Sequence, residues 1–224
     1  MAKYGGYFLL DNGWPFVTPD SIPLRLDSVH VVESRNATAS KEIYMDTSKT
    51  IIPFLMVETY STGQPFQKVV IPGYHVGNGK VTISGACYAG RDPGEFRLTC
   101  LIFTNAPKPL RQGMYGAAFF DAGGQLVLTN EDRVLTDMMT IGTRGVERHT
   151  GIYIDEWHDG RLGIIPGIAG ARVGQGHSTA YFATYSEGGR TRVLAALAGS
   201  PPPGATGTIN AGTVVTCVNF DNYL

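Results

Sequence analysis

The chain contains few cysteines and few charged residues. Its three cysteines, Cys87, Cys100 and Cys217, are an odd number and lack the spacing of a zinc site. Cys100 and Cys217 lie inside apolar runs, where a cysteine usually behaves as a small buried hydrophobe. Charged residues make up only 17% of the chain and give a net charge of −1. Because there is no basic surplus, nucleic acid is not an expected partner.

Long hydrophobic runs are also missing. The first residues, MAKYGGYFLLDNGW, contain one lysine and an apolar run that Asp11 and Asn12 interrupt. This run is too short for the central region of a secretory signal peptide. No other stretch approaches the roughly 20 apolar residues that cross a bilayer. We therefore expect a protein that is made in the cytoplasm and does not insert into a membrane.

The sequence lacks the common motifs of catalysis and cofactor binding. None of its five histidines belongs to an HxH or HExxH motif or forms a ligand pair with a nearby cysteine. There is no GxSxG elbow and no P-loop, and the glycines lie in turns between predicted strands. We therefore expect no catalytic residues, no metal and no cofactor. A glycan hydrolase or esterase that uses Glu156 or Asp159 is the enzymatic alternative.

The sequence does contain an internal echo. Residues 4–24 read YGGYFLLDNGWPFVTPDSIPL and residues 115–135 read YGAAFFDAGGQLVLTNEDRVL, at a constant offset of 111 positions (115 − 4). The same residue occurs at six pairs of positions at that offset: Tyr4 and Tyr115, Gly5 and Gly116, Phe8 and Phe119, Gly13 and Gly124, Thr18 and Thr129, Leu24 and Leu135. Such a match predicts a tandem duplication.

Three later motifs continue the echo. IYMD at 43–46 recurs as IYID at 152–155, and IIP at 51–53 recurs at 164–166. LTCLIFTN ends the first half, and VTCVNFDN ends the second. We therefore predict a first module at residues 1–105, a linker at 106–114 and a second module at 115–224. Each predicted module is of ordinary domain size.

Short apolar runs separated by turn residues predict an all-β fold. Gly77-Asn78-Gly79 and Gly188-Gly189 each lie between two strand-like runs and predict β-hairpins. No stretch has the pattern of a long amphipathic helix. We predict two tandem antiparallel β-sandwich modules with seven or eight strands each. Pro53 predicts an edge strand or a β-bulge at its position, and Pro166 predicts the same feature in the second module.

The candidate interaction residues are Glu156, Trp157, His158, Asp159 and Arg161. We interpret residues 156–162 as a loop inserted in the second module. A carboxylate, an imidazole and an indole in one loop can bind a sugar or an ion, and they can equally be exposed residues of a protein contact. Trp157 is the leading anchor candidate, because tryptophan is enriched in interface hot spots.

Other segments are assigned more briefly. Residues 34–41, residues 200–211 and the linker are further contact candidates, since they differ between the two modules. Asp46 and Asp155 are shared by both halves. We interpret them as carboxylates at strand ends that accept hydrogen bonds from turn amides.

The amino-terminal pattern consists of an aromatic-Gly pair, a hydrophobic strand, a DNG turn and then VTPDSIPL. In residues 4–26, repeated at 115–135, it resembles the start of small virion proteins of tailed bacteriophages, encoded near the tail-tip and central-fibre genes. The resemblance implies a structural or host-contacting role in the virion tail, with other tail proteins as partners in a ring or trimeric assembly. A module that binds a host glycan or receptor is the alternative.

Overall fold

The computed structural model describes residues 23–35, 37–60, 69–87, 95–108, 116–120 and 123–224, together with the backbone of 8–9 and 15–17. In this part of the chain the regular elements are β-strands and three short 3-10 helices, η2 (Glu147–His149), η3 (Gly151–Tyr153) and η4 (Phe220–Asn222). The prediction of an all-β fold is confirmed.

The first set of strands forms two antiparallel layers. One layer has the order β3-β8-β5, with β3 at Arg25–Ser34, β8 at Phe96–Thr104 and β5 at Ile51–Thr59. The other has the order β4-β7-β6, with β4 at Thr38–Tyr44, β7 at Lys80–Cys87 and β6 at Val70–Gly77. Side chains from both layers form one buried core, which includes Leu55, Val81 and Cys100.

The second set repeats this order. One layer is β11-β18-β13, with β11 at Met139–Ile141, β18 at Val215–Asn219 and β13 at Leu162–Ile164. The other is β12-β16-β15, with β12 at Asp155–Asp159, β16 at Arg190–Leu197 and β15 at Gly176–Glu187. Two further strands, β14 (Ile168–Gly174) and β17 (Gly207–Asn210), extend this layer beyond β15.

Each set is preceded by a small hairpin. β1 (Phe8–Leu9) pairs with β2 (Pro15–Val17), and β9 (Ala118–Phe120) pairs with β10 (Leu126–Thr129). Phe8 pairs with Val17 as Phe119 pairs with Leu128, so both partners are shifted by the same 111 positions. The sequence echo and the pairing therefore agree at these hairpins. That the two sets arose by duplication stays a prediction.

The two sets are joined by backbone pairing. Leu55 in β5 pairs antiparallel with Ile164 in β13, and Val70 in β6 pairs with Thr184 in β15. The sheets are therefore continuous from one set to the other. A third join lies near the hairpins, where the amide of Leu135 donates to the carbonyl of Leu24 at 2.8 Å. Because backbone hydrogen bonds cross at several places, the sets are held at a fixed mutual angle.

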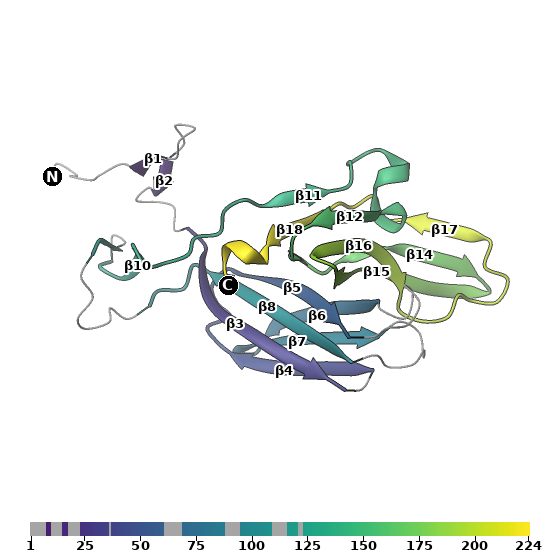
Figure 1. Ribbon diagram of the computed structural model, residues 1–224, viewed down its shortest axis with the longest axis horizontal. Coiled ribbons are helices and arrows are strands. Elements are labelled where there is room, and N and C mark those ends of the chain that lie inside the picture. The colour runs from purple at the N-terminus through teal and green to yellow at the C-terminus, as the bar shows by residue number, and fades with distance from the viewer. Residues whose placement is uncertain are drawn as a thin grey trace.

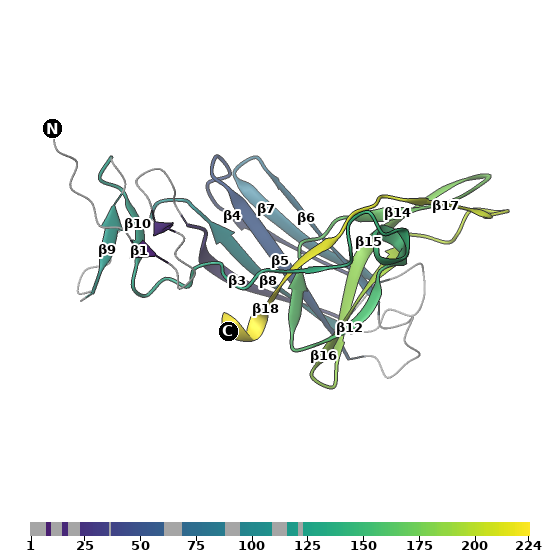
Figure 2. The ribbon, with the colours of Figure 1, turned by 90° about the horizontal axis from the view of Figure 1, so that it is seen from above.

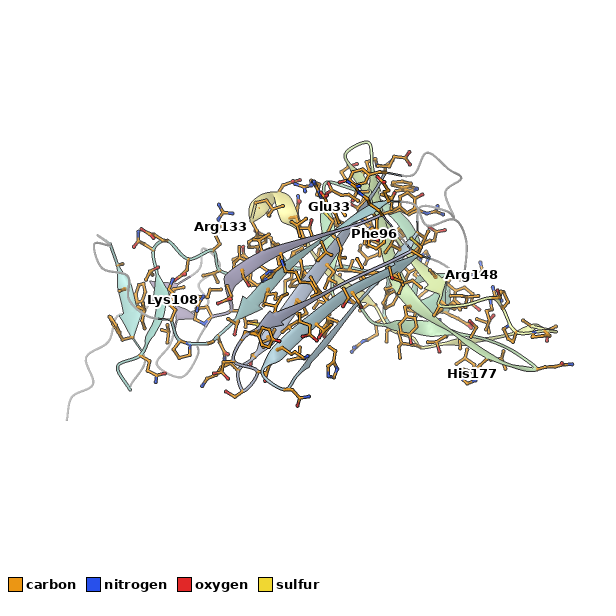
Figure 3. All side chains as sticks on the ribbon, turned by 90° about the horizontal axis from the view of Figure 1, so that it is seen from below. Glu33, Phe96, Lys108, Arg133, Arg148 and His177 are labelled. Carbon is orange, nitrogen blue, oxygen red and sulfur yellow. The ribbon has the colours of Figure 1, made fainter. Side chains whose placement is uncertain are left out.

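Figures 1 and 2 show an elongated molecule with the β1–β2 and β9–β10 hairpins at one end and the β14–β17 ribbon at the other. Figure 3 places Lys108 near the hairpins and His177 near the opposite end. The carboxyl terminus lies between them, where η4 packs beside β5 and β8. There Phe220 and Tyr223 share a buried cluster with Phe54 and Phe103.

The predicted hairpin turns are confirmed. Asn78 and Gly79 connect β6 to β7 with φ values of 53° and 74°. Gly188 and Gly189 connect β15 to β16 with φ values of 59° and 76°. Two consecutive positive φ values are typical of the tight turn whose twist matches antiparallel strands.

Several finer predictions are wrong. β5 is an interior strand that pairs with both β8 and β13, so Pro53 does not mark an edge. Pro53 is tolerated because the pairing with β13 is limited to Leu55, two residues further on. Pro166 lies just after β13 rather than inside a strand. The described part of the second set, with its hairpin, contains ten strands, more than the seven or eight expected.

Two of the sequence echoes are out of structural register. Ile43 and Tyr44 lie in strand β4, whereas Ile152 and Tyr153 lie in helix η3. The strand partner of Cys100 is Leu55 and that of Cys217 is Ile164. Ile164 is therefore the structural counterpart of Leu55. The IIP match in the sequence instead aligns Ile164 with Ile51, which is wrong.

Candidate functional site

The predicted interaction residues lie mostly on a strand rather than in a loop. Residues 155–159 form β12, which pairs along its whole length with β16 and is the edge of its layer among the described residues. The prediction of an inserted loop at 156–162 is therefore wrong for most of that stretch. Side chains alternate along a strand, so Asp155, Trp157 and Asp159 point outward while Glu156 and His158 point to the other face.

Trp157 is held in a defined orientation on this outer face. Its ring meets the ring of Tyr185 edge to face, with 5.4 Å between centroids and an angle of 84°. The guanidinium groups of Arg190 and Arg192 lie 5.7 Å and 6.0 Å from the indole centroid. Trp157 nevertheless keeps 38% of its surface exposed. A rigid aromatic side chain is therefore presented to solvent.

Asp155 and Arg192 form a two-pronged ion pair beside Trp157. Arg192 donates from Nε to Asp155 Oδ1 at 2.6 Å and from Nη2 to Oδ2 at 2.7 Å. Its Nη1 donates to the hydroxyl of Tyr185 at 3.2 Å. The hydrogen bond to Asp155 raises the pKa of the Arg192 guanidinium above its usual value, so Arg192 stays protonated.

A second ion pair lies on the other side of the indole. Arg190 Nε is 3.1 Å from Asp159 Oδ1, and both side chains are largely exposed. An exposed pair of this kind contributes little to stability. Together with the first pair it balances the charge around Trp157. We name the outward surface formed by Asp155, Trp157, Asp159, Arg190 and Arg192, together with the buried ring of Tyr185 beneath it, the Trp157 face.

Glu156 and His158 point away from the Trp157 face. His158 Nε2 lies 3.4 Å from Glu156 Oε2. This contact does not have hydrogen-bond geometry, and the buried Nε2 makes no hydrogen bond in the described structure. These two residues therefore do not share a surface with Trp157.

Arg161 joins the two strand sets. One of its terminal nitrogens is 3.5 Å from Glu58 in β5, and the other is 3.6 Å from Asp221 in η4. Its carbonyl oxygen accepts a hydrogen bond from the amide of Phe220 at 2.8 Å. Arg161 thus contacts both strand sets, and its role as an interaction residue stays a prediction.

The two carboxylates shared by the sequence halves have different roles. Asp46 accepts hydrogen bonds from the amide and hydroxyl of Ser48 at 3.0 Å and 2.6 Å, as predicted for a turn carboxylate. These bonds hold the pKa of Asp46 below its usual value. Asp155 instead lies in a strand and binds Arg192, so its interpretation as a turn carboxylate is wrong.

The corresponding surface of the first set has a different character. Lys80 and Arg190 both open the second strand of their hairpins, and each pairs with an edge strand. Two residues after Lys80, Thr82 pairs with Glu42, and two residues after Arg190, Arg192 pairs with Trp157. Trp157 is therefore at the position equivalent to Glu42, and Arg192 is at the position equivalent to Thr82. Glu42 binds Lys80 at 2.5 Å, and neither member of the cross-strand pair Glu42–Thr82 is aromatic. The same scaffold position therefore carries an exposed aromatic residue in the second set alone.

A second candidate surface is the free edge of β3. β3 pairs with β8 on one side. On the other side, residues 133–135 cover the first residues of β3, and no described strand pairs with the rest. Val29 and Val31 on this strand are 42% and 46% exposed. The segment 28–32 reads SVHVV and carries no fixed charge. We name this segment and its flanks, residues 27–33, the β3 edge.

The other predicted contact segments are only partly loops. Residues 38–41 belong to β4, and residues 207–210 form β17. Most of the predicted linker lies outside the described residues, as do residues 4–7 and Trp14. Lys108, within the described part of the linker, binds Asp132.

The described residues contain no group of three His, Cys, Asp or Glu side chains that could hold a metal ion. None of the helices among them is long and apolar enough to cross a membrane. No family model, curated protein or solved structure matches this chain. The Trp157 face and the β3 edge are therefore the surfaces from which a function is inferred.

Proposed function

We propose that this chain is a non-enzymatic structural component of a bacteriophage virion, in the tail tip, baseplate or fibre region, where it joins other tail proteins. The resemblance of residues 4–26 and their echo at 115–135 supports the viral assignment. The β3 edge is the observation that carries the joining role, because one side of this strand has no described strand partner and the strand carries two exposed valines.

The β3 edge suits the addition of a strand from a neighbouring protein. An edge strand presents backbone N–H and C=O groups that a second chain satisfies by pairing. Residues 27–33 span about 23 Å at roughly 3.3 Å per residue, which is longer than an average strand. Exposed valines add apolar contact on one face of such a joint. Proteins usually protect an edge of this kind with lysine or proline, and the segment 28–32 contains neither.

The joined sheets favour a rigid adaptor. Backbone pairing at Leu55–Ile164 and Val70–Thr184 fixes the two sets relative to each other. A body that does not bend at its middle transmits a fixed geometry between its neighbours. This property fits a ring or trimeric assembly, in which every copy must keep the same angle.

A complementation experiment tests the proposal. Phage particles lacking the chain are supplied with the wild-type protein or with Val29→Lys/Val31→Lys, and incorporation is measured by quantitative mass spectrometry of purified virions. We expect the double variant to reduce incorporation at least about tenfold, since a charge of this kind blocks edge pairing. Ser40→Lys on β4, the edge of the opposite layer, is the matched control and should be incorporated normally.

Two outcomes would contradict the proposal. One is that purified virions do not contain the wild-type chain. The other is that the double variant is incorporated as well as the control. Thermal unfolding of each purified variant shows beforehand that the substitutions leave the fold intact.

The second candidate function is binding of a host-surface glycan or receptor. The Trp157 face favours it, because it presents an exposed indole between two ion pairs. Adsorption of the purified full chain to host cells tests this function. Adsorption that Trp157→Ala abolishes supports it, and a lack of adsorption by the wild-type chain rules it out.

A further inference from the structure

We propose that the Trp157 face is a binding site for a neutral glycan built from hexopyranose units. This inference rests on the second candidate function and specifies its ligand class. It depends on the described contacts of six residues: Asp155, Trp157, Asp159, Tyr185, Arg190 and Arg192.

The indole supplies the apolar part of the site. A pyranose ring has a face of C–H groups, which packs on an aromatic side chain, and an outer rim of hydroxyls. Trp157 combines exposure of 38% with contacts to Tyr185, Arg190 and Arg192 that restrict its rotation. A side chain whose orientation is already fixed loses little conformational entropy when a ligand binds.

The Asp155–Arg192 pair supplies the polar part. Arg192 uses three of its five N–H groups on Asp155 and Tyr185, and two remain to donate. The two oxygens of Asp155 each accept one bond from Arg192 and keep lone pairs for another donor. Neighbouring donors and acceptors in fixed positions match the two hydroxyls of a vicinal diol, each of which both donates and accepts.

The charge balance of the face favours a neutral ligand. Arg192 is bound to Asp155 and Arg190 to Asp159, so neither arginine presents an uncompensated positive charge. An acidic glycan or a phosphate group would meet one carboxylate beside each guanidinium group, Asp155 beside Arg192 and Asp159 beside Arg190. A neutral sugar encounters no such repulsion. The ligand should therefore carry hydroxyls rather than carboxylates or phosphates.

The first strand set shows that the scaffold does not require this arrangement. At the matching row it places Glu42 and Thr82 where the second set places Trp157 and Arg192. Both rows lie on the same kind of edge strand and hairpin. The first set also has an ion pair at this row, between Glu42 and Lys80, and the exposed Tyr44 lies two residues further along β4. What the second set adds is an indole held between two arginines, and the sheet itself does not require it. Glu42 also provides a matched control position in the same molecule.

Fluorescence and NMR of the full chain test the proposal directly. The protein has two tryptophans, so Trp14→Phe leaves Trp157 as the only indole. This variant is titrated with neutral oligosaccharides, namely maltoheptaose, cellohexaose, mannohexaose and a β-galactan fragment, and with polygalacturonate as the acidic comparison. The readouts are Trp157 emission and the indole N–H resonance. We expect saturable shifts with at least one neutral oligosaccharide and none with polygalacturonate.

Variants assign the binding to the face. Asp155→Asn keeps the side-chain volume and should weaken binding at least about tenfold, as should Arg192→Lys, which loses the two-pronged geometry. Glu42→Ala should bind like the parent. For Trp157→Ala, binding is followed by calorimetry, and heat of binding should be lost while thermal unfolding remains cooperative.

Three results would overturn the proposal. They are a lack of shifts with every neutral oligosaccharide, a preference for polygalacturonate, and binding that persists in Trp157→Ala. Each of these leaves the joining role of the β3 edge standing, since incorporation into virions is measured separately. Conversely, glycan binding without incorporation would remove the joining role and keep this site.

Discussion

Leu55 and Ile164 pair with each other at the junction of the two strand sets, and each also pairs with a buried cysteine of its own set. Leu55 pairs with Cys100, and Ile164 pairs with Cys217. All four residues have 0% exposure. The two cores are thus separate clusters, and this backbone pair is one of the places where the two sets meet, so we expect the stabilities of the cores to be coupled there.

Truncation at the junction should be costly. Leu55→Ala and Ile164→Ala each remove a fully buried aliphatic side chain, which typically costs about 2–5 kcal/mol. Because the residues are paired, the double variant should deviate from additivity by about 0.5–3 kcal/mol in urea unfolding. Leu55→Ala combined with Val193→Ala, which lies in the second core, is the control and should be additive. Additivity of the junction pair would contradict the coupling.

Gly163 in β13 is required by the ring of Phe220. A Cβ at position 163 would lie 1.9 Å from a ring carbon of Phe220, which is itself fully buried. Gly163→Ala should therefore destabilise the protein by about 1–3 kcal/mol, as overpacking does. At Gly167 the nearest atom to an added Cβ is 3.6 Å away, so Gly167→Ala serves as the control. Equal melting temperatures for the two variants would contradict this account.

The buried cysteines should resist alkylation. Burial raises the pKa of Cys217 to about 12 and that of Cys100 further, so both thiols remain protonated at neutral pH. Since the thiolate is the reactive form, iodoacetamide should modify neither in the native protein. Both should react after denaturation. Partly exposed Cys87 is the comparison, and mass spectrometry locates the label. Native-state labelling of Cys217 as fast as Cys87 would show that β18 opens.

Asp132 should make the second hairpin sensitive to acid. Burial opposes its ionisation, but hydrogen bonds from Lys108 and from the amide and hydroxyl of Thr129 outweigh burial and hold its pKa below the usual value. Figure 3 shows Lys108 in this region. A lowered folded-state pKa stabilises the protein above the unfolded pKa of about 3.9, and this contribution is lost as pH falls through the folded value.

Hydrogen exchange at the Thr129 amide measures this effect. Its protection should fall as pH drops below about 4 in the wild-type protein, after correction for intrinsic exchange. Asp132→Asn should cost about 1–3 kcal/mol of local stability at neutral pH and remove the acid dependence. Asp137→Asn, at an exposed position nearby, is the control and should behave as wild type. A pH-independent protection in the wild-type protein would refute the assignment.

The sequence by itself determined the features that depend on neighbouring residues. Asn78-Gly79 and Gly188-Gly189 set the hairpins because these residues accept positive φ at little cost, and the turn then fixes the register of the strands on both sides. The apolar surroundings of Cys100 and Cys217 predicted their burial. The offset between residues 4–24 and 115–135 corresponds to the identical pairing of the two small hairpins.

Only the tertiary structure decided which distant segments meet. β12 pairs with β16 although residues 160–189 lie between them, and that pairing places Arg192 beside Asp155 and Trp157. No local rule selects such a partner, because it depends on how all layers pack and bury their apolar faces. For the same reason the sequence pointed to Trp157 but missed Tyr185, Arg190 and Arg192. It also made Ile164 the equivalent of Ile51, whereas the pairing of Ile164 with Cys217 and of Leu55 with Cys100 makes Ile164 the structural counterpart of Leu55.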